Sequence, residues 1–262
     1  MSELAGLDLA PAPGAAPGRQ MVLAQAAAEG RALIRNGEQL LLTLIIPLLL
    51  LSMLGLEPIV NFGAGISRID FMTPGIMALA VMSTAFTSQA IATGFERRYG
   101  VLKRLGATPL SRVQLITAKT LTVVAVELVQ GVLILLVGLA IGWRPHAAAS
   151  AIVVVPLLLL LGTAAFSGLA LAMAGSLRAE ATLAAANLVW IVLLGLGGVV
   201  FPLTRFPAGA RHVFELLPTG ALSTGLRDVL AHQVAFPVGN TVTLLVWAVA
   251  AIVVAARVFK WE

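Results

Sequence analysis

Long apolar runs without an ionisable side chain restrict what this chain can fold into. A transmembrane helix needs about 20 mostly apolar residues. The sequence contains six runs of about this kind, and one of them, 115–143, is apolar apart from Lys119 near one end and Glu127 inside it. The runs are continuously apolar, whereas the strands of a membrane barrel alternate. We therefore expect an all-α integral membrane protein with six transmembrane helices, five of them from runs free of Asp, Glu, Lys and Arg: 39–56, 71–95, 147–177, 181–204 and 229–256.

The composition supports this class. Apolar residues make up 59% of the chain and charged residues 11%, against about 45–50% and about 25% in soluble domains. Cysteine is absent, which excludes disulfides, thiolate catalysis and cysteine-based zinc sites. The run 147–177 is longer than one span needs, so we expect an interfacial turn within it. Pro237 is expected to mark the start of the last span.

Lys and Arg are concentrated on one side of the predicted spans. Most of the 17 lie before the first span, between the second and third, between the fourth and fifth, and after the sixth. Basic residues collect in cytoplasmic loops, so both termini are expected in the cytoplasm of a multi-pass inner-membrane protein. This asymmetry also explains the net charge of +5, and nucleic-acid binding is not expected.

The chain divides into three predicted regions. Residues 1–18 are rich in Ala, Pro and Gly and are expected to be a disordered cytoplasmic N-terminus; they lack the pattern of a signal peptide. Residues 19–37 predict an amphipathic interfacial helix on the inner leaflet, with an ordinary solvated linker helix as the alternative. Residues 38–262 form the predicted six-helix transmembrane domain.

The loop 95–112 carries the most specific pattern. Phe95, Tyr99 and Leu102 are spaced as one apolar face of a helix, and Gly106 and Pro109 end it. One interpretation is a basic anchor for phospholipid headgroups. The other is a helix that docks on a cytoplasmic partner.

The outer segment 201–238 contains several prolines and two short apolar stretches, 208–217 and 220–230. Neither stretch is long enough to cross a bilayer. A pair of half-depth re-entrant helices fits this pattern, because non-helical backbone at membrane depth must be buried in protein or line a cavity. A plain amphipathic outer loop is the alternative.

The charge order of 96–104, followed by Ala-Thr-Pro-Leu-Ser-Arg, resembles the cytoplasmic loop of ABC-2 type transporter permeases, in the daunorubicin-resistance branch of bacterial drug exporters. The segment 217–227 is similar to the family's outer hairpin, which would include Pro202, Pro207, Pro218 and Arg227. The resemblance implies that the loop is a coupling helix. The residues it would place at or near the contact with the ATPase are Glu96, Arg97, Arg98, Gly100, Arg104, Pro109 and Arg112.

The resemblance also implies the partners. Two copies of a cytoplasmic ATPase would bind ATP and Mg, and a second permease chain, identical or homologous, would pair with this one within the membrane lipid. A hydrophobic or amphipathic substrate, such as a drug or a lipid, would then leave the cell between the paired permeases, near the second and fifth spans.

The motifs of a self-sufficient enzyme are absent from the sequence. There is no Gly-x-x-x-x-Gly-Lys-Ser/Thr phosphate loop, so ATP must be bound by another polypeptide. His146, His212 and His232 are isolated, which makes a metal site unexpected. We therefore expect a transport subunit that binds no cofactor of its own, not an enzyme.

Glu127 is the one acidic residue predicted within a span. It is either a substrate-path or proton-relay residue, or, as we favour, a residue near the cytoplasmic boundary that pairs with Lys119 or a loop arginine. An ion-driven secondary transporter that depends on Glu127 and a non-transporting membrane scaffold are the rival functions. The small residues Ala164, Gly168 and Ala172 predict a helix-packing face. The sequence leaves open the substrate, the choice between homodimer and heterodimer, and, beyond the resemblance, the direction of transport.

Overall fold

A computed structural model describes residues 14–37, 41–56 and 67–258, and within this part the chain forms helices and loops without a strand. In chain order the elements are α1 (Gly18–Arg35), η1 (Leu41–Ile45), α3 (Ile46–Leu56), α4 (Arg68–Val81), η2 (Met82–Ser88), α5 (Gln89–Arg98), α6 (Val101–Gly106), α7 (Arg112–Ala140), α8 (Ala151–Ser176), α9 (Ala179–Leu196), η3 (Leu203–Arg205), α10 (Ala208–Glu215), α11 (Pro218–Leu230) and α12 (Val238–Val258).

The prediction of an all-α membrane protein is confirmed. By length and composition, the described residues contain five helices able to cross a membrane: Arg68–Arg98, Val113–Ala140, Ala151–Ser176, Ala179–Leu196 and Val238–Val258. The predicted first span corresponds to a shorter apolar helix, Thr43–Leu56. Because residues 38–40 and 57–66 on either side of it lie outside the described residues, the total of six spans stays a prediction.

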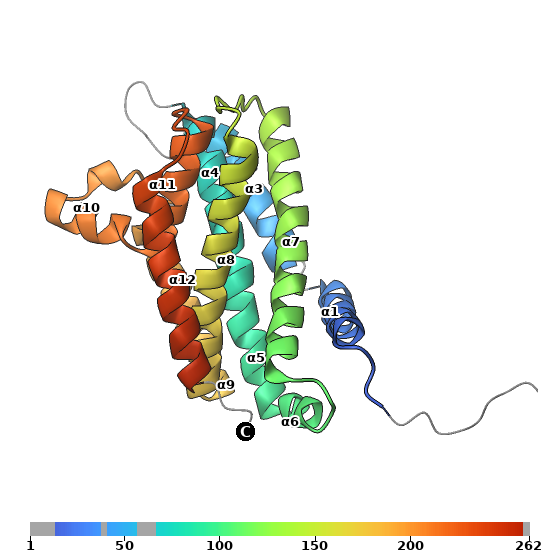
Figure 1. Cartoon of the computed structure of the whole chain (residues 1–262). Coiled ribbons are helices and arrows are strands. Elements are labelled where there is room, and N and C mark those ends of the chain that lie inside the picture. The colour runs from blue at the N-terminus through green and yellow to red at the C-terminus, as the bar shows by residue number, and fades with distance from the viewer. Residues whose placement is uncertain (1–13, 38–40, 57–66, 259–262) are drawn as a thin grey trace, which may run out of the picture.

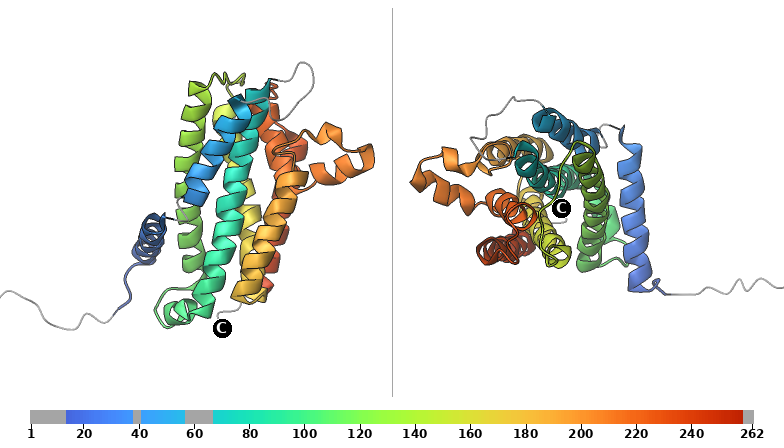
Figure 2. Two further views of the ribbon diagram at one scale, coloured as in Figure 1. Left: turned by 180° about the vertical axis from the view of Figure 1, so that it is seen from behind. Right: turned by 90° about the horizontal axis from the view of Figure 1, so that it is seen from above.

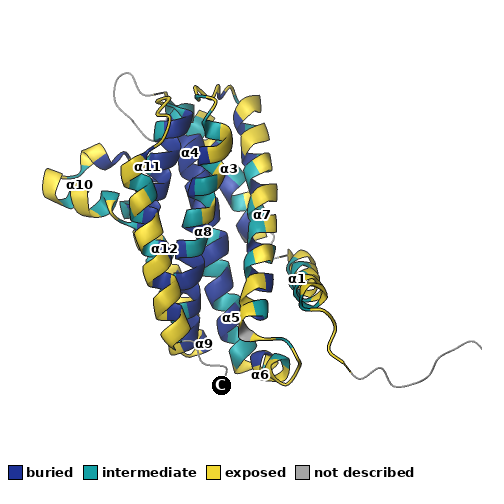
Figure 3. Cartoon of the chain, in the orientation of Figure 1, coloured by how far each residue is buried: buried dark blue, intermediate teal, exposed yellow. Residues whose placement is uncertain are grey.

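The centre of the bundle is the continuous helix α4–η2–α5 (Figure 1). In its most apolar window 83% of the residues are buried, against 22% to 44% in the other four spans. The middle of this helix, η2, is π-helical, and α3, α7, α8, α9 and α11 all pack against parts of it. In Figure 3 it is dark blue along α4 and a mixture of dark blue and teal along α5, whereas α7 and α12 expose their outer faces.

The close pair α8 and α12 depends on a small residue. A side chain at Gly168 would begin 2.7 Å from the Cβ atom of Ala251, so only glycine permits this approach. Pro237 directly precedes α12, as predicted. The turn expected inside 147–177 lies near its beginning, at 149–150, and α8 then runs unbroken to Ser176.

The helices run up and down between two ends of the bundle (Figures 1 and 2). The α6 end is the one where α5 passes into α6, α8 turns into α9, and α12 finishes. At the opposite end α7 connects to α8 and α11 to α12. α1 lies across the outside of α7, and α10 projects sideways from the bundle. Residues 1–13 of the predicted disordered terminus lie outside the described residues, and the membrane-surface position of α1 stays a prediction.

Candidate functional site

The loop after α5 is a turn and a short helix, so the prediction of one helix with Phe95, Tyr99 and Leu102 on one face was wrong. α5 ends at Arg98, and α6 begins only at Val101. Gly100 has a φ of +69°, a left-handed conformation that breaks the helix. Leu102 is therefore buried, whereas Tyr99 is 65% exposed. α6 ends at Gly106, and the exposed Pro109 lies in the loop before α7.

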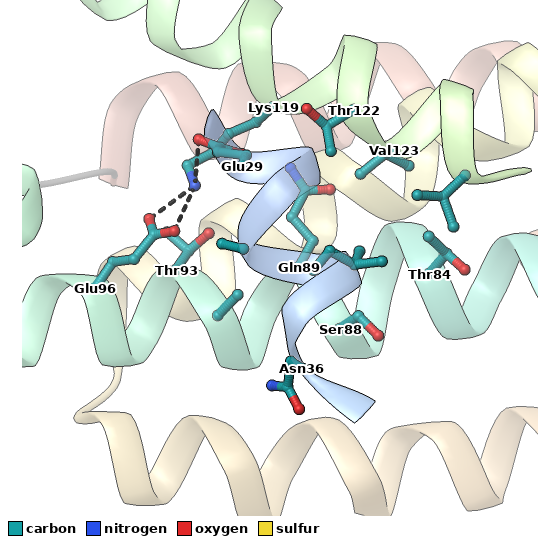
Figure 4. Close-up of a pocket in the computed structure, with 14 residues that line it drawn as sticks. Glu29, Asn36, Thr84, Ser88, Gln89, Thr93, Glu96, Lys119, Thr122 and Val123 are labelled. Atoms are coloured by element: carbon teal, nitrogen blue, oxygen red, sulfur yellow. Dashed lines mark hydrogen bonds and ion pairs between the residues drawn. The ribbon is translucent and has the colours of Figure 1, made fainter. Parts of the chain in front are cut away.

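Glu96 faces the interior of the bundle and binds Lys119 on α7 (Figure 4). The Lys119 ammonium lies 2.9 and 2.7 Å from the two carboxylate oxygens of Glu96, and 3.1 Å from an oxygen of Glu29 on α1. The Lys119 side chain is only 5% exposed. Since a buried ammonium needs compensating charge, this ion cluster joins α1, α5 and α7 at one point.

Arg97 and Arg98 connect α5 to the α8–α9 turn. Arg97 donates from Nη1 to the carbonyl oxygen of Gly175 at 2.7 Å, and from Nη2 to that of Leu177. These carbonyls lie at the C-terminal end of α8, where helix carbonyls lack partners within the helix. Arg98 forms an ion pair with Glu180 on α9. Both arginines therefore have contacts within the chain, which the sequence interpretation did not foresee.

The residues left facing outward define what we call the α6 surface. It combines two basic side chains with apolar and small polar ones, and it consists of Tyr99, Val101, Lys103, Arg104, Thr108 and Pro109. Among the residues predicted to contact an ATPase, Arg104 and Pro109 belong to this surface, whereas Glu96 and Arg97 are committed to the bundle. Arg112 is the first residue of α7, and its side chain lies outside the described part.

α7 is anchored directly after this loop. Ser111 accepts a hydrogen bond from the backbone N–H of Gln114 at 3.3 Å, and the Gln114 side chain accepts one from the Ser111 N–H at 2.8 Å. This reciprocal arrangement is a capping box, which satisfies two donors that a helix start leaves unpaired. The start of α7 is thus fixed by local sequence. α6 therefore lies between the end of α5, which is bonded to α8 and α9, and the capped start of α7.

Glu127 does not pair with Lys119, so the favoured interpretation of this residue was wrong. Its Oε2 atom lies 2.5 Å from the hydroxyl oxygen of Thr163 on α8, and its Oε1 atom is enclosed without a partner in the described part of the chain. The Thr163 hydroxyl is also 2.8 Å from the Leu159 carbonyl. Thr163 is the donor in both contacts, and a hydroxyl has one hydrogen to donate, so the Glu127 carboxyl and the Leu159 carbonyl share it.

The segment between α9 and α12 contains two helices where two short stretches were predicted. Pro202 precedes η3, Pro207 precedes α10, and Pro218 is the first residue of α11, where its missing N–H is tolerated. α11 packs against α4, α8 and α12, whereas α10 has no buried residue. The depth of these helices in a membrane stays a prediction.

Arg227 fixes α11 to the central helix. Its guanidinium donates to the carbonyl oxygens of Phe71 at 3.0 Å and Val199 at 3.2 Å. The guanidinium carbon also lies 3.6 Å from the centre of the Phe71 ring, within the range of a cation–π contact. The buried Arg227 thereby joins α11, the start of α4 and the segment after α9.

A groove opens between η1, η2, α5 and α9, with a cavity volume of about 670 Å³. Drug-sized ligands occupy pockets of about 300–1,000 Å³. Trp190 on α9 donates to the Ser83 hydroxyl at 2.9 Å across it, and no charged side chain appears among the described residues that line it. The sequence analysis missed this site. Its polar lining includes Thr43, Ser83, Thr87, Ser88, Asn187 and Trp190.

These features define a class of protein. Large apolar side chains such as Leu128 on α7, Ile191 on α9 and Val246 on α12 are more than half exposed, which fits helices that face lipid or another membrane protein. With its apolar spans and internal groove, the chain is a multi-pass α-helical membrane protein.

Comparison with known families then identifies it more closely. The family model described as ABC-2 type transporter matches residues 22–231, and the chain belongs to this family. Its members are transport subunits rather than catalytic ones. The resemblance inferred from the loop is thus confirmed at the level of the family, and the daunorubicin-resistance branch stays a prediction. A comparison with curated proteins found no match.

Proposed function

We propose that the chain is the membrane subunit of an ATP-driven exporter, and that the α6 surface is its contact with a cytoplasmic ATPase. Family membership supports the permease role. The observation that carries the docking role is that α6 exposes two basic side chains, Lys103 and Arg104, while the adjoining end of α5 is bonded to neighbouring helices through Glu96 and Arg97. A partner that pushed on α6 would push on a rigid part of the bundle.

The attachments suggest how motion would spread. Displacement of α6 would act on α5 and α7 through the chain itself, on α8 and α9 through Arg97 and Arg98, and on α1 through Lys119. ATP would shift the equilibrium between two arrangements of the bundle only if the ATPase binds the α6 surface differently in each. Two ATPase copies, carrying ATP and Mg, would act on two paired permeases.

The groove is the proposed part of the substrate path. Its hydroxyl, amide and indole groups can hydrogen-bond a ligand, and its apolar walls suit a hydrophobic or amphipathic molecule, such as a drug or a lipid. It lies between parts of the predicted first, second and fifth spans. A second permease chain, identical or homologous, would close its open side.

This proposal sets the orientation in the inner membrane. The α6 end and both termini would be cytoplasmic, which agrees with the many basic residues at that end. α10 and α11 would then form the outer re-entrant hairpin, and Thr43–Leu56 would be the core of the first of six spans. The substrate would leave toward the hairpin side.

The test is purification of the tagged chain from its native membrane in mild detergent, followed by mass spectrometry. Wild type is compared with Lys103→Glu/Arg104→Glu and with Arg144→Glu, a charge reversal at the opposite end. We expect an ATPase with a phosphate-binding loop to co-purify with wild type and with Arg144→Glu, but not with the double variant. If no ATPase co-purifies with wild type, the exporter proposal fails. If the ATPase co-purifies with all three proteins, the α6 surface is not the contact.

One observation favours a second candidate function. Glu127 is an acidic side chain enclosed within a predicted span, which is the kind of group that an ion-driven secondary transporter uses. That function predicts transport driven by a proton gradient without an ATPase. A non-transporting scaffold subunit would instead bind an ATPase, and addition of a transport substrate would not stimulate ATP hydrolysis by that ATPase.

A further inference from the structure

A second cavity lies between α1, α5 and α7, beside the ion cluster (Figure 4). Its volume is about 220 Å³, less than the roughly 300 Å³ at which drug-sized pockets begin. Unlike the groove, it is lined by charged groups, which among the described residues are Glu29, Glu96 and Lys119. Its size suits the polar head of a ligand rather than a whole drug molecule.

The electrostatics of the cavity favour a cation. An ammonium group has three hydrogens, and those of Lys119 face both oxygens of Glu96 and one oxygen of Glu29. Lys119 therefore has no donor left for an anionic ligand. Two carboxylates against one ammonium leave the described lining with a net charge of −1, which attracts positive charge.

Two buried polar side chains on α5 lack partners beside this cavity. Gln89 is 6% exposed and Thr93 is 1% exposed. Within the described part of the chain, both polar atoms of the Gln89 amide and the Thr93 hydroxyl make no hydrogen bond. Such groups destabilise a fold when they stay unpaired. Spaced four residues apart, they lie on one helix face and offer two oxygen acceptors to an N–H donor.

α1 forms the outer wall of the cavity and lies at the surface of the bundle. No residue of α1 is buried. The contacts that hold it on α7 include the Lys119–Glu29 pair and a 3.1 Å hydrogen bond from the Thr122 hydroxyl to the Ala26 carbonyl. A small outward shift of α1 would uncover the enclosed atoms of Gln89 and Thr93 without disturbing the packed helices.

We propose that this cavity binds the protonated primary amine of an organic cation, with the apolar remainder of the ligand lying between α1 and the bundle. The amine would donate to Gln89, Thr93 and Glu29. The site differs from the uncharged groove, and binding to it requires neither ATP nor an ATPase. Failure of the exporter proposal would therefore leave this proposal testable.

The probe is dansylcadaverine, a fluorophore on a five-carbon primary amine, with N-pentyl dansylamide as its uncharged counterpart. Both are titrated into nanodiscs of phosphatidylcholine that contain the full chain, and into empty nanodiscs. We expect saturable binding of the amine to the protein and no binding of the uncharged counterpart beyond that to empty nanodiscs. Glu29→Gln should weaken binding at least about tenfold, because it removes a charge-assisted hydrogen bond. The control Glu215→Gln, outside the cavity, should leave it unchanged.

Gln89→Leu separates a ligand site from a structural role. It removes an unpaired buried amide at nearly constant volume, so it should raise the unfolding midpoint of the chain while weakening amine binding about tenfold. Thr93→Val should act in the same direction. The proposal is overturned if the uncharged probe binds as tightly as the amine, if Glu29→Gln behaves like Glu215→Gln, or if Gln89→Leu lowers stability and binding together. Should Glu29→Gln fail to fold, the α5 variants decide.

Discussion

Replacing Lys119 with methionine should destabilise the chain far more than removing a surface cation. The Lys119 side chain is 5% exposed and lies within 3.1 Å of two carboxylates. Both carboxylates are thus within about 6 Å of each other, and at an effective dielectric of about 20 their repulsion is about 3 kcal/mol once the cation is gone. Buried pairs broken on one side typically lose about 3–5 kcal/mol, and we expect a loss in this range.

The assay is reversible unfolding in mixed micelles with increasing dodecyl sulfate, which gives a free energy of unfolding. Arg211→Met is the matched control, because Arg211 forms an ion pair with Glu215 at 2.6 Å with both side chains at least a third exposed. Such exposed pairs contribute about 0–1 kcal/mol.

A triple variant tests the reason for the loss. Lys119→Met/Glu29→Gln/Glu96→Gln removes all three charges at similar side-chain volume, and with them both the carboxylate repulsion and the cost of keeping charges away from water. We expect it to recover to within about 1 kcal/mol of wild type. The reasoning is refuted if Lys119→Met costs no more than Arg211→Met, or if the triple variant is as unstable as the single one.

Three further predictions concern the turn, the helix packing and the intramembrane acid. Gly100→Ala should cost about 1–2 kcal/mol in the same assay and Gly100→Asn less, because φ is +69° and a Cβ there meets no neighbour. Gly168→Ala should cost about 1–3 kcal/mol through its clash with Ala251. Gly195→Ala, where a Cβ meets nothing within 4 Å, should stabilise α9 by up to about 1 kcal/mol; equal effects at the two glycines would contradict the packing argument. Glu127→Gln should keep ATP-driven transport in inverted vesicles, since an amide can still bond Thr163, whereas loss of transport driven by a proton gradient would support the rival function.

The spans could be predicted from the sequence because each depends on local composition. Apolar length alone located α8 and α9, and Pro237 placed the start of α12. The break after Arg98 could not be predicted in the same way. The spacing of Phe95, Tyr99 and Leu102 fits a helix, and glycine is compatible with either sign of φ. Only the folded chain decides that Gly100 takes the positive one.

The ion pairs were missed for a different reason. Glu96 and Lys119 are 23 positions apart in sequence, and Arg97 reaches Gly175 from 78 positions away. Charge order identifies a basic loop, but it does not separate residues that face a partner from residues that hold the loop in place. The groove was harder still to predict from the sequence, because Ser83 and Thr87 are small polar residues inside an apolar run. The one unusual feature was Trp190, whose indole N–H lies in the middle of a predicted span.

The π-helical segment η2 is a point at which the two halves of the central helix, α4 and α5, could rotate relative to each other. On the α4 side, Arg227 donates a hydrogen bond to the Phe71 carbonyl. On the α5 side, Lys119 binds Glu96, and Arg97 donates to the Gly175 carbonyl of α8. A π turn holds one more residue than an α turn, so conversion of η2 to regular α geometry would rotate one half against the other by about 100°, the angle of one residue. Ser83, Thr87 and Ser88 lie in η2 and line the groove. Such a rotation would turn these polar side chains relative to a bound ligand, and it would require release of the contacts that hold one end of the helix.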